Sequence, residues 1–241
     1  MTIQKIVVLT GAGISAESGL GTFRDKDGIW TKYPLEDLAT PEGFVRNPEF
    51  VHGFYNDRRD ALKTARPHDG HEALARLERE WCSWGRSFML VTQNVDNLHE
   101  QAGSSSERLI HMHGELAKVR CGACGTITQS MDRISTESIC PACGLKGQMR
   151  PHVVWFGEIP LGMDEITEAV ASVDLFISVG TSGNVYPAAS FVEMAKSIGA
   201  RTVELNLEPS ENAYVFDDAE YGPASEILPR WVDEFLANNA N

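Results

Sequence analysis

The stretch VVLTGAGISAESG, residues 7–19, places Gly11, Gly13 and Ala16 after an apolar run and at the expected start of a helix. This spacing is the G-x-G-x-x-A form of the dinucleotide-binding fingerprint. Glycine lets the backbone approach a pyrophosphate, and a helix N-terminus offers free N–H groups to it. The same glycines could serve only a tight turn, so the loop alone is a weak indication of a nucleotide site.

Short apolar runs of strand length recur along the chain and are rich in Val, Ile, Leu or Phe. They lie at residues 5–10, 87–92, 175–179 and 201–207. Apolar residues with helical spacing lie between or after them, at 71–82, at 164–173 and around Ile227, Trp231 and Phe235. Strands that alternate with helices predict a parallel sheet covered on both faces. We therefore expect an α/β fold with a Rossmann-like, doubly wound parallel sheet.

Two stretches break this alternation. Residues 31–70 contain several prolines in an irregular and helical pattern, and residues 117–149 contain four paired cysteines. We expect these two stretches to form a smaller inserted domain, a helical module plus a zinc ribbon. The larger domain would then comprise residues 1–30, 71–116 and 150–241.

The cysteine pairs are Cys121-x-x-Cys124 and Cys140-x-x-Cys143, separated by fifteen residues. This spacing is a strong indication of a zinc ribbon, in which four thiolates hold a tetrahedral Zn²⁺. Because sulfur fills all four positions, no position remains for water, and we predict one structural Zn²⁺. The alternatives are a redox-active pair or chance spacing. Cys82 is left over and is expected to be a small core side chain.

The charge and cysteine content indicate where the chain works. Acidic residues outnumber basic ones 34 to 21, giving a net charge of -13 and a pI near 4.9, which disfavours a nucleic-acid partner. Paired cysteines suit a metal site in a reducing compartment. The first apolar run is too short for a membrane span and lacks the pattern of an export signal. We expect a cytoplasmic protein, a monomer by preference, without a membrane or nucleic-acid partner.

One element of the dinucleotide fingerprint is displaced. The acidic residue that holds the adenine ribose normally follows about 20 positions after the glycines, whereas Asp25 and Asp27 come early, in FRDKDG. The stretch ELNLEPS offers Asn206 and Glu208 at a later strand end instead. Residues 178–183, SVGTSG, form another strand end with small polar residues suited to phosphate or ribose.

Eight stretches, taken together, resemble the sirtuin family. They are GAGIS (11–15), TFRDKDGIW (22–30), QNVDNLH (93–99), HMHGE (111–115), the four cysteines, VVWFGE (153–158), GTSGNVYP (180–187) and NLE (206–208). They follow the family's order and cover nearly the whole chain. The chain is most similar to bacterial class III sirtuins, which FYNDRR (54–59) supports. The resemblance implies an NAD-dependent protein lysine deacylase that acts on acyl-lysine side chains of many proteins.

The resemblance also implies that NAD lies across the carboxyl ends of the strands, with a mobile loop that closes over it and excludes water. The pyrophosphate would lie at the glycine loop, the nicotinamide and its ribose at residues 93–96, and the adenosine at the later strand ends. The residues expected to bind NAD are Gly11, Ala12, Gly13, Ile14, Ser15, Thr22, Phe23, Arg24, Trp30, Gln93, Asn94, Val95, Asp96, Gly180, Thr181, Ser182, Asn206, Leu207, Glu208 and Ala224.

His113 matches the family's catalytic position. By family analogy, the acyl oxygen attacks C1′ of the nicotinamide ribose and expels nicotinamide, and a base then activates the 2′-hydroxyl. Histidine suits this step because its ordinary pKa lies near neutral. A lone histidine outside such a motif is more often structural, and that interpretation is kept for His111, His99 and His71.

Tyr55 and Arg58 lie three positions apart in FYNDRR, so they share one face of a helix. They resemble the class III Tyr-x-x-Arg pair that accepts succinyl and malonyl groups, because the guanidinium fork and the phenol both donate to a carboxylate. The alternative is a solvated helix face on which Arg58 and its neighbour pair with Asp57 or Asp60.

The stretch VVWFGE is expected to offer an extended edge to which a substrate peptide adds through main-chain hydrogen bonds. Its expected substrate contacts are Val154, Trp155, Phe156 and Gly157. The side chains of residues 154–156 could equally belong to the core.

Three rival functions follow from the same residues. A protein ADP-ribosyltransferase would begin from the same broken glycosidic bond. A non-catalytic module that binds NAD and zinc would need no base. A dehydrogenase is disfavoured, because the predicted zinc site is closed and the usual acidic fingerprint residue is absent.

Overall fold

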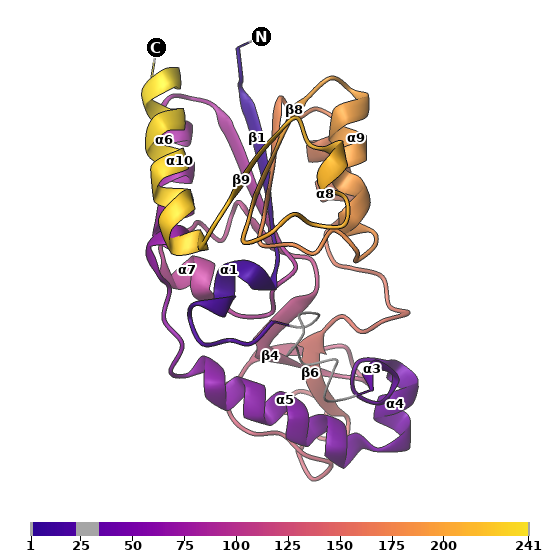
Figure 1. The fold of residues 1–241 in the computed structure, drawn as a ribbon. Coiled ribbons are helices and arrows are strands. Elements are labelled where there is room, and N and C mark those ends of the chain that lie inside the picture. Colours follow the sequence, from indigo (N-terminus) through magenta and orange to yellow (C-terminus); the bar gives the residue numbers. More distant parts are fainter. Residues whose placement is uncertain (1, 23–33, 241) are drawn as a thin grey trace.

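The computed structural model describes residues 2–22 and 34–240 (Figure 1). Its main element is a six-stranded sheet in the order β3-β2-β1-β7-β8-β9, with parallel pairing throughout. The strands are β1 (Lys5–Thr10), β2 (Ser87–Thr92), β3 (Leu109–His111), β7 (Leu175–Val179), β8 (Arg201–Asn206) and β9 (Asp218–Tyr221). The predicted parallel sheet is confirmed. Its strand order reverses between β1 and β7, the position where open α/β sheets bind ligands.

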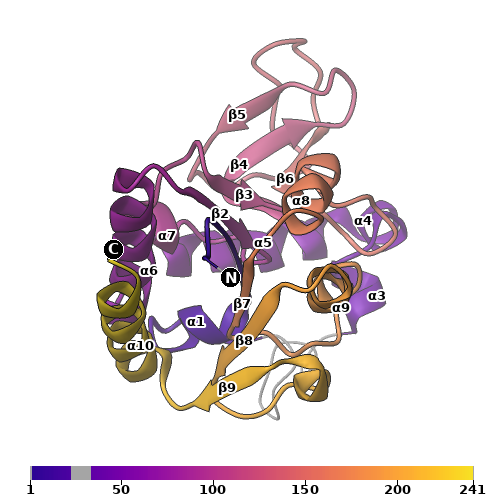
Figure 2. The ribbon, with the colours of Figure 1, turned by 90° about the horizontal axis from the view of Figure 1, so that it is seen from above.

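Helices cover both faces of this sheet, as Figure 2 shows from above. One face carries α6 (Asp69–Ser83) and α10 (Ala224–Asn239), and the other carries α8 (Met163–Val170) and α9 (Phe191–Ser197). Strand β1 shows why both faces are buried. Ile6 and Val8 pack against α6 and α10, while Val7 and Leu9 pack against α8 and α9. The doubly wound arrangement follows from this alternation.

The second part of the molecule lies at the carboxyl ends of the large sheet (Figure 1). It contains a three-stranded antiparallel sheet in the order β5-β4-β6 and, in the part of the chain that the structure describes, three helices. These elements are β4 (Gly114–Cys121), β5 (Ile127–Gln129), β6 (Met149–Val153), α3 (Leu35–Leu38), α4 (Pro41–Arg46) and α5 (Pro48–Leu62). The strands β4 and β6 extend a few residues past the expected limits at 117 and 149, and the division into two domains stays a prediction.

Short elements complete the described chain. They are α1 (Ala12–Ala16), α7 (Leu98–Gln101) and the 3-10 turns at Ala188–Ser190 and Ala213–Val215. Cys82 is half-buried and packs against the core under α6 and α10, near the core position expected for it. Among the described residues, no helix combines the length and apolar character needed to cross a bilayer.

Candidate functional site

The glycine loop packs against the turn that follows β7. The Gly11 N–H donates to the Val179 carbonyl and the Gly13 N–H to the Gly180 carbonyl, both at 2.9 Å. A Cβ atom at Gly13 would lie 2.7 Å from Gly180 Cα, closer than side chains tolerate. These glycines therefore let two loops meet at the point where the strand order reverses. Helix α1 follows directly, although it spans only five residues.

Three polar side chains join the glycine loop to the segment after β2. The Asn94 amide donates to the Gly11 carbonyl at 3.0 Å and to Ser15 Oγ at 3.1 Å. Ser15 in turn donates to Asp96 Oδ2 at 2.9 Å. Asp96 also accepts from the Leu98 N–H at 3.1 Å, and burial raises the pKa of its carboxyl. The structure thus brings together residues that the sequence assigned to NAD from two distant motifs.

A pocket of about 80 Å³ opens beside this network. It is lined by Ala12, Ser15, Gly19, Leu20, Gly21, Arg58, Ala61, Leu62, Asn94, Val95, Asp96 and Leu116. The large sheet supplies the residues expected at the nicotinamide end, and helix α5 supplies Arg58. The apolar lining by Leu20, Leu62 and Leu116 was not predicted, because an apolar residue carries no chemical signature in a sequence.

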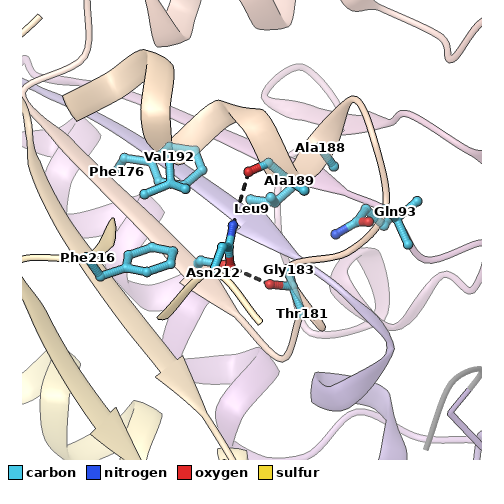
Figure 3. A pocket seen from close by; sticks show the side chains of 12 residues that line it. Leu9, Gln93, Phe176, Thr181, Gly183, Ala188, Ala189, Val192, Asn212 and Phe216 are labelled. Carbon is cyan, nitrogen blue, oxygen red and sulfur yellow. Dashed lines mark hydrogen bonds between the residues drawn. The ribbon is translucent and has the colours of Figure 1, made fainter. Parts of the chain in front are cut away.

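A second, much smaller cavity of about 10 Å³ lies between β7 and α9 (Figure 3). Its lining includes Gln93 and Thr181, two of the residues expected to bind NAD. A cavity of this size admits about one water molecule, so a nucleotide does not fit inside it. The Ser178 and Thr181 hydroxyls lie 2.9 Å apart, and Asn212 donates to the Ala189 carbonyl at 3.1 Å. These bonds hold the turn after β7 in place.

The residues expected at the adenosine lie at the carboxyl ends of β7 and β8. The Asn206 amide donates to the Thr181 carbonyl at 2.8 Å, which ties the two strand ends together. Ser182, Leu207 and Glu208 are exposed there, and Ala224 begins α10. Thr22 ends the first described segment. Phe23, Arg24 and Trp30 lie outside the described residues.

His113 follows β3 and precedes β4. Its Nδ1 lies 3.0 Å from the Gln93 carbonyl oxygen, and because a carbonyl only accepts, Nδ1 carries the proton and Nε2 has a free lone pair. Burial lowers the pKa of His113, so the ring is neutral at pH 7. Gly114 has a φ of 80°, and a Cβ there would lie 2.2 Å from the His152 carbonyl oxygen. The glycine after the histidine is therefore required by the backbone.

His111 is the last residue of β3, and both of its ring nitrogens have polar partners. Its Nε2 lies 3.0 Å from Glu100 Oε1, and its Nδ1 lies 3.2 Å from the Asn94 carbonyl oxygen. Burial opposes the charged ring, but the Glu100 carboxylate outweighs burial and raises the pKa of His111. The ring links helix α7 to the Asn94 backbone.

Acid is expected to destabilise the fold through buried neutral histidines. Burial lowers the pKa of His52 and His99 to about 4 and that of His71 to about 2. The unfolded chain, with a histidine pKa of about 6.5, therefore binds more protons below that pH. The free energy of unfolding should be highest above about pH 6.5 and fall as the pH drops toward 4. His99 alone should lower the free energy of unfolding by about 2 kcal/mol at pH 5.

Urea unfolding at pH 7, 6 and 5 measures this effect. His52 provides the matched variant, since both its ring nitrogens are buried without a hydrogen-bond partner among the described residues and its ring packs edge-on against Phe44. His52→Phe keeps an aromatic ring and removes the titrating group, so the loss of stability between pH 7 and 5 should become smaller. An unchanged pH dependence in this variant would contradict the assignment.

The four paired cysteines come together at one end of the antiparallel sheet. All four Sγ atoms lie within 4.8 Å of one another, with Cys121 to Cys143 at 3.8 Å and Cys124 to Cys140 at 3.7 Å. A tetrahedral zinc with Zn–S bonds of about 2.3 Å separates its sulfur ligands by about 3.8 Å. The arrangement fits one structural Zn²⁺.

Helix α5 places Arg58 in the pocket lining, and Tyr55 lies one turn before it and is buried. The Tyr55 hydroxyl accepts from Trp155 Nε1 at 2.9 Å, and burial raises its pKa to about 12. Arg58 lines the pocket, where burial lowers the pKa of its guanidinium while Tyr55 and Asp96 oppose this.

The neighbours of Arg58 on α5 have other partners. Asp57 and Asp60 pair with Arg133, and Asp60 also pairs with Lys63. Arg59 is fully buried and donates to the Leu116 carbonyl at 3.0 Å. These contacts disfavour the alternative of a solvated helix face.

The stretch 154–157 directly follows β6 and is held by main-chain hydrogen bonds. The Val154 N–H donates to the His113 carbonyl and the Phe156 N–H to the Ala39 carbonyl, both at 2.8 Å, and the Trp155 N–H donates to Glu158 Oε2 at 2.8 Å. A peptide that adds here would therefore bind to the carbonyls and to Gly157. The Trp155 side chain is 2% exposed and belongs to the core, whereas Phe156 is 40% exposed.

Taken together, a glycine loop at the reversal point of a doubly wound sheet and a four-thiol metal site define a class of zinc-bearing dinucleotide-binding proteins. A family model described as the Sir2 family matches residues 11–187. The chain belongs to this family, and the resemblance to sirtuins is confirmed.

Individual relatives agree with the family assignment. The chain is 57% identical to an NAD-dependent protein deacylase of Caulobacter vibrioides, over 98% of each chain. A solved complex of a Sir2 homologue with NAD superposes with a TM-score of 0.88 at 38% identity, covering 98% of this chain and 91% of that one. A mutant Sir2 homologue bound to 2′-O-acetyl ADP ribose gives a TM-score of 0.89 at 38% identity, covering 99% of this chain and 94% of that one.

Proposed function

We propose that this Sir2-family chain is an NAD-dependent protein lysine deacylase that removes acetyl and acidic acyl groups, succinyl and malonyl, from lysine. The products would be nicotinamide and 2′-O-acyl-ADP-ribose. One observation carries the proposal. His113 is neutral and its Nδ1–H is fixed on the Gln93 carbonyl, so that its Nε2 stays free. Gln93 directly precedes Asn94, Val95 and Asp96, which line the pocket.

We assign binding, base and structural roles to residues of this chain. Bound NAD supplies an electrophilic ribose carbon. Asn94 and Asp96 hold the ribose and the nicotinamide at the buried end of the pocket, and Gly11 and Gly13 let the pyrophosphate approach the backbone. With NAD and acyl-lysine bound, the acyl oxygen would displace nicotinamide from the ribose carbon. The Nε2 atom of His113 would then take the proton of the ribose 2′-hydroxyl as its oxygen bonds to the acyl carbon. Addition of water and departure of the lysine amine would leave 2′-O-acyl-ADP-ribose. The Zn²⁺ held by the four cysteines would stabilise the antiparallel sheet and take no part in this step.

Nicotinamide release tests the proposal. An acetyl-lysine or succinyl-lysine peptide should trigger release of nicotinamide from NAD, and the acyl group should appear on free ADP-ribose. Label from NAD on the target protein would instead indicate an ADP-ribosyltransferase. No release with either peptide would indicate a non-catalytic binding module.

The pocket favours acidic acyl groups in this proposal. Arg58 and Tyr55 offer a guanidinium and a neutral phenol to an acyl carboxylate, and a hydrogen bond to a charged group is worth about 1.5–3 kcal/mol, or about 10- to 150-fold in preference. Arg58→Met combined with Tyr55→Phe should therefore lower the ratio of desuccinylation to deacetylation by about 10- to 100-fold.

Steady-state kinetics on one peptide with either acyl group measures this ratio. Arg133→Met is the matched control, since it also removes one arginine from the smaller part of the molecule but its guanidinium pairs with Asp57 and Asp60 at the surface. Equal losses of kcat/KM for both acyl groups in the Arg58→Met, Tyr55→Phe double variant would count against an acyl-binding role.

The setting of the enzyme is part of the same proposal. Five free thiols suit a reducing compartment such as the cytoplasm, and the net charge of -13 favours protein substrates with basic flanks over nucleic acid. The chain would act as a monomer on many acyl-lysine proteins.

A further inference from the structure

The Trp155 indole determines which hydrogen bond the Tyr55 hydroxyl makes. Its Nε1 lies 2.9 Å from the Tyr55 oxygen, and both side chains are buried. An indole N–H only donates, so the Tyr55 oxygen must be the acceptor. The hydroxyl proton is therefore not used by the indole, which is the only hydrogen-bond partner of this hydroxyl within residues 2–22 and 34–240.

Arg150 and Glu158 hold the Trp155 indole and its backbone in place. The Arg150 guanidinium carbon lies 3.3 Å from the centre of the Trp155 ring. Arg150 donates to both Glu158 carboxylate oxygens, at 2.8 and 3.0 Å, and to the Val153 carbonyl at 2.9 Å. Glu158 also accepts from the Trp155 backbone N–H at 2.8 Å. Rotating the indole away from Tyr55 would break its stacking on Arg150. The indole N–H is therefore held toward Tyr55 before any substrate binds.

Tyr55 lies one helical turn before Arg58, and the Arg58 guanidinium acts on the Tyr55 hydroxyl through its charge. Since the phenol stays protonated, it has one proton to give. In the proposed function, an acyl carboxylate bound at Arg58 would be the acceptor that this proton takes. Without the indole, the hydroxyl could rotate and donate elsewhere, and part of the preference for a carboxylate would be lost.

We propose that Trp155 is a positioning residue for acidic acyl groups, acting through Tyr55 and not by touching the substrate. Its indole N–H holds the Tyr55 oxygen as an acceptor and leaves the phenolic proton for the acyl carboxylate. This proposal rests on the proposed deacylase function and assigns Trp155 a place behind the pocket, unlike the direct substrate contact that the sequence indicated.

Trp155→Phe tests the proposal, because it keeps an aromatic ring under Arg150 and removes the N–H donor together with part of the indole. The ratio of kcat/KM for succinyl-lysine to that for acetyl-lysine should fall about 3- to 10-fold, mainly through a higher KM for the succinyl peptide. In a Tyr55→Phe background, the same substitution should leave the ratio unaffected, since the hydroxyl that it orients is gone. Trp231→Phe, which changes a tryptophan stacked on Phe235 in α10, is the matched control and should not alter the ratio.

A second measurement does not depend on turnover. In protein labelled with ¹³C at the tyrosine Cζ, Trp155→Phe should shift the Tyr55 resonance in the absence of any substrate, whereas Trp231→Phe should not. A Tyr55 resonance that does not shift in Trp155→Phe would overturn the hydrogen bond between the indole and the Tyr55 hydroxyl. Equal losses for both acyl groups, or a further fall of the ratio in the Tyr55→Phe background, would overturn the positioning role.

The outcomes also separate this proposal from the proposed function. A wild-type protein that turns over neither peptide contradicts the deacylase function itself. A wild-type protein that deacetylates without accepting succinyl-lysine leaves the deacylase function standing and overturns the role of Trp155. A succinyl preference that collapses in Trp155→Phe but not in Trp231→Phe supports both.

Discussion

Replacing His113 with Asn is expected to lower kcat for every acyl substrate by about 10²- to 10⁴-fold, the usual contribution of a positioned general base. The Asn amide N–H can still donate to the Gln93 carbonyl, which His113 Nδ1 does at 3.0 Å. The substitution therefore keeps the local backbone bond and removes only the free Nε2. The loss should be equal for acetyl-lysine and succinyl-lysine, because the base acts on the ribose and not on the acyl chain.

The order of steps gives this variant a sharper test. Nicotinamide is expelled before the base is needed, so exchange of labelled nicotinamide into NAD should survive in His113→Asn far better than deacylation. His52→Asn is the matched control, since it makes the same substitution at a buried histidine of helix α5 whose ring packs against Phe44. More than about a tenth of wild-type deacylation in His113→Asn would remove this residue from the mechanism.

The pH dependence of turnover follows from the same ring. Burial lowers the pKa of His113 below its ordinary value, so the free base should already be present at neutral pH. The rate should fall only when the pH drops through the lowered pKa and the ring takes up a proton.

The large sheet could be predicted because its central strands are apolar on both faces. Ile6 and Val8 serve one core and Val7 and Leu9 the other, so the run stands out without an alternating pattern. Strands β3 and β9 were missed because they are only three and four residues long and lie at the edges of the sheet. Strand β9 is also mostly exposed, so its composition does not indicate a strand. Its pairing with β8 makes it one.

The predicted helix over 164–173 was too long by three residues. The structure ends α8 at Val170, although Val173 remains buried in the turn that follows. Apolar spacing reports which side chains face the core, and a turn that packs on the same core continues that spacing past the helix. The run 201–207 was likewise one residue too long, because Leu207 is already exposed.

The candidate site could be predicted wherever a motif carries chemistry. Glycines, amides, carboxylates and cysteines at fixed spacings each indicated a role, and the structure places Ser15, Asn94 and Asp96 in one network. The contact between Trp155 and Tyr55 spans 100 positions in the chain. Nothing local in either motif indicates such a contact. The sequence therefore left the side chain of Trp155 open between the substrate and the core, and the structure places it in the core.

Replacing Cys140 with Ala is expected to remove the zinc and unfold the antiparallel sheet. Cys140 is 1% exposed and belongs to a small core that, among the described residues, has five buried members, Val119, Cys121, Ile134, Cys140 and Met149. So small a core does not hold a fold alone, whereas structural zinc contributes about 10–16 kcal/mol in zinc-finger peptides. Metal content should fall from about one zinc per chain to nearly none. Cys82→Ala is the matched control and should keep its zinc, since Cys82 lies on α6, far from the other thiols in the sequence.

Hydrogen exchange then shows how far the loss spreads. Amides of β4, β5 and β6 should lose protection, while β1, β2 and β7 keep theirs, because the large sheet has two cores of its own. Deacylation should fall as well, since β4 begins one residue after His113 and the His113 carbonyl accepts from Val154 beside β6. A zinc-free Cys140→Ala protein with wild-type protection and activity would refute the structural role of the metal. Loss of activity with the antiparallel sheet intact would instead point to zinc in the chemistry, which the four thiol ligands leave no position for.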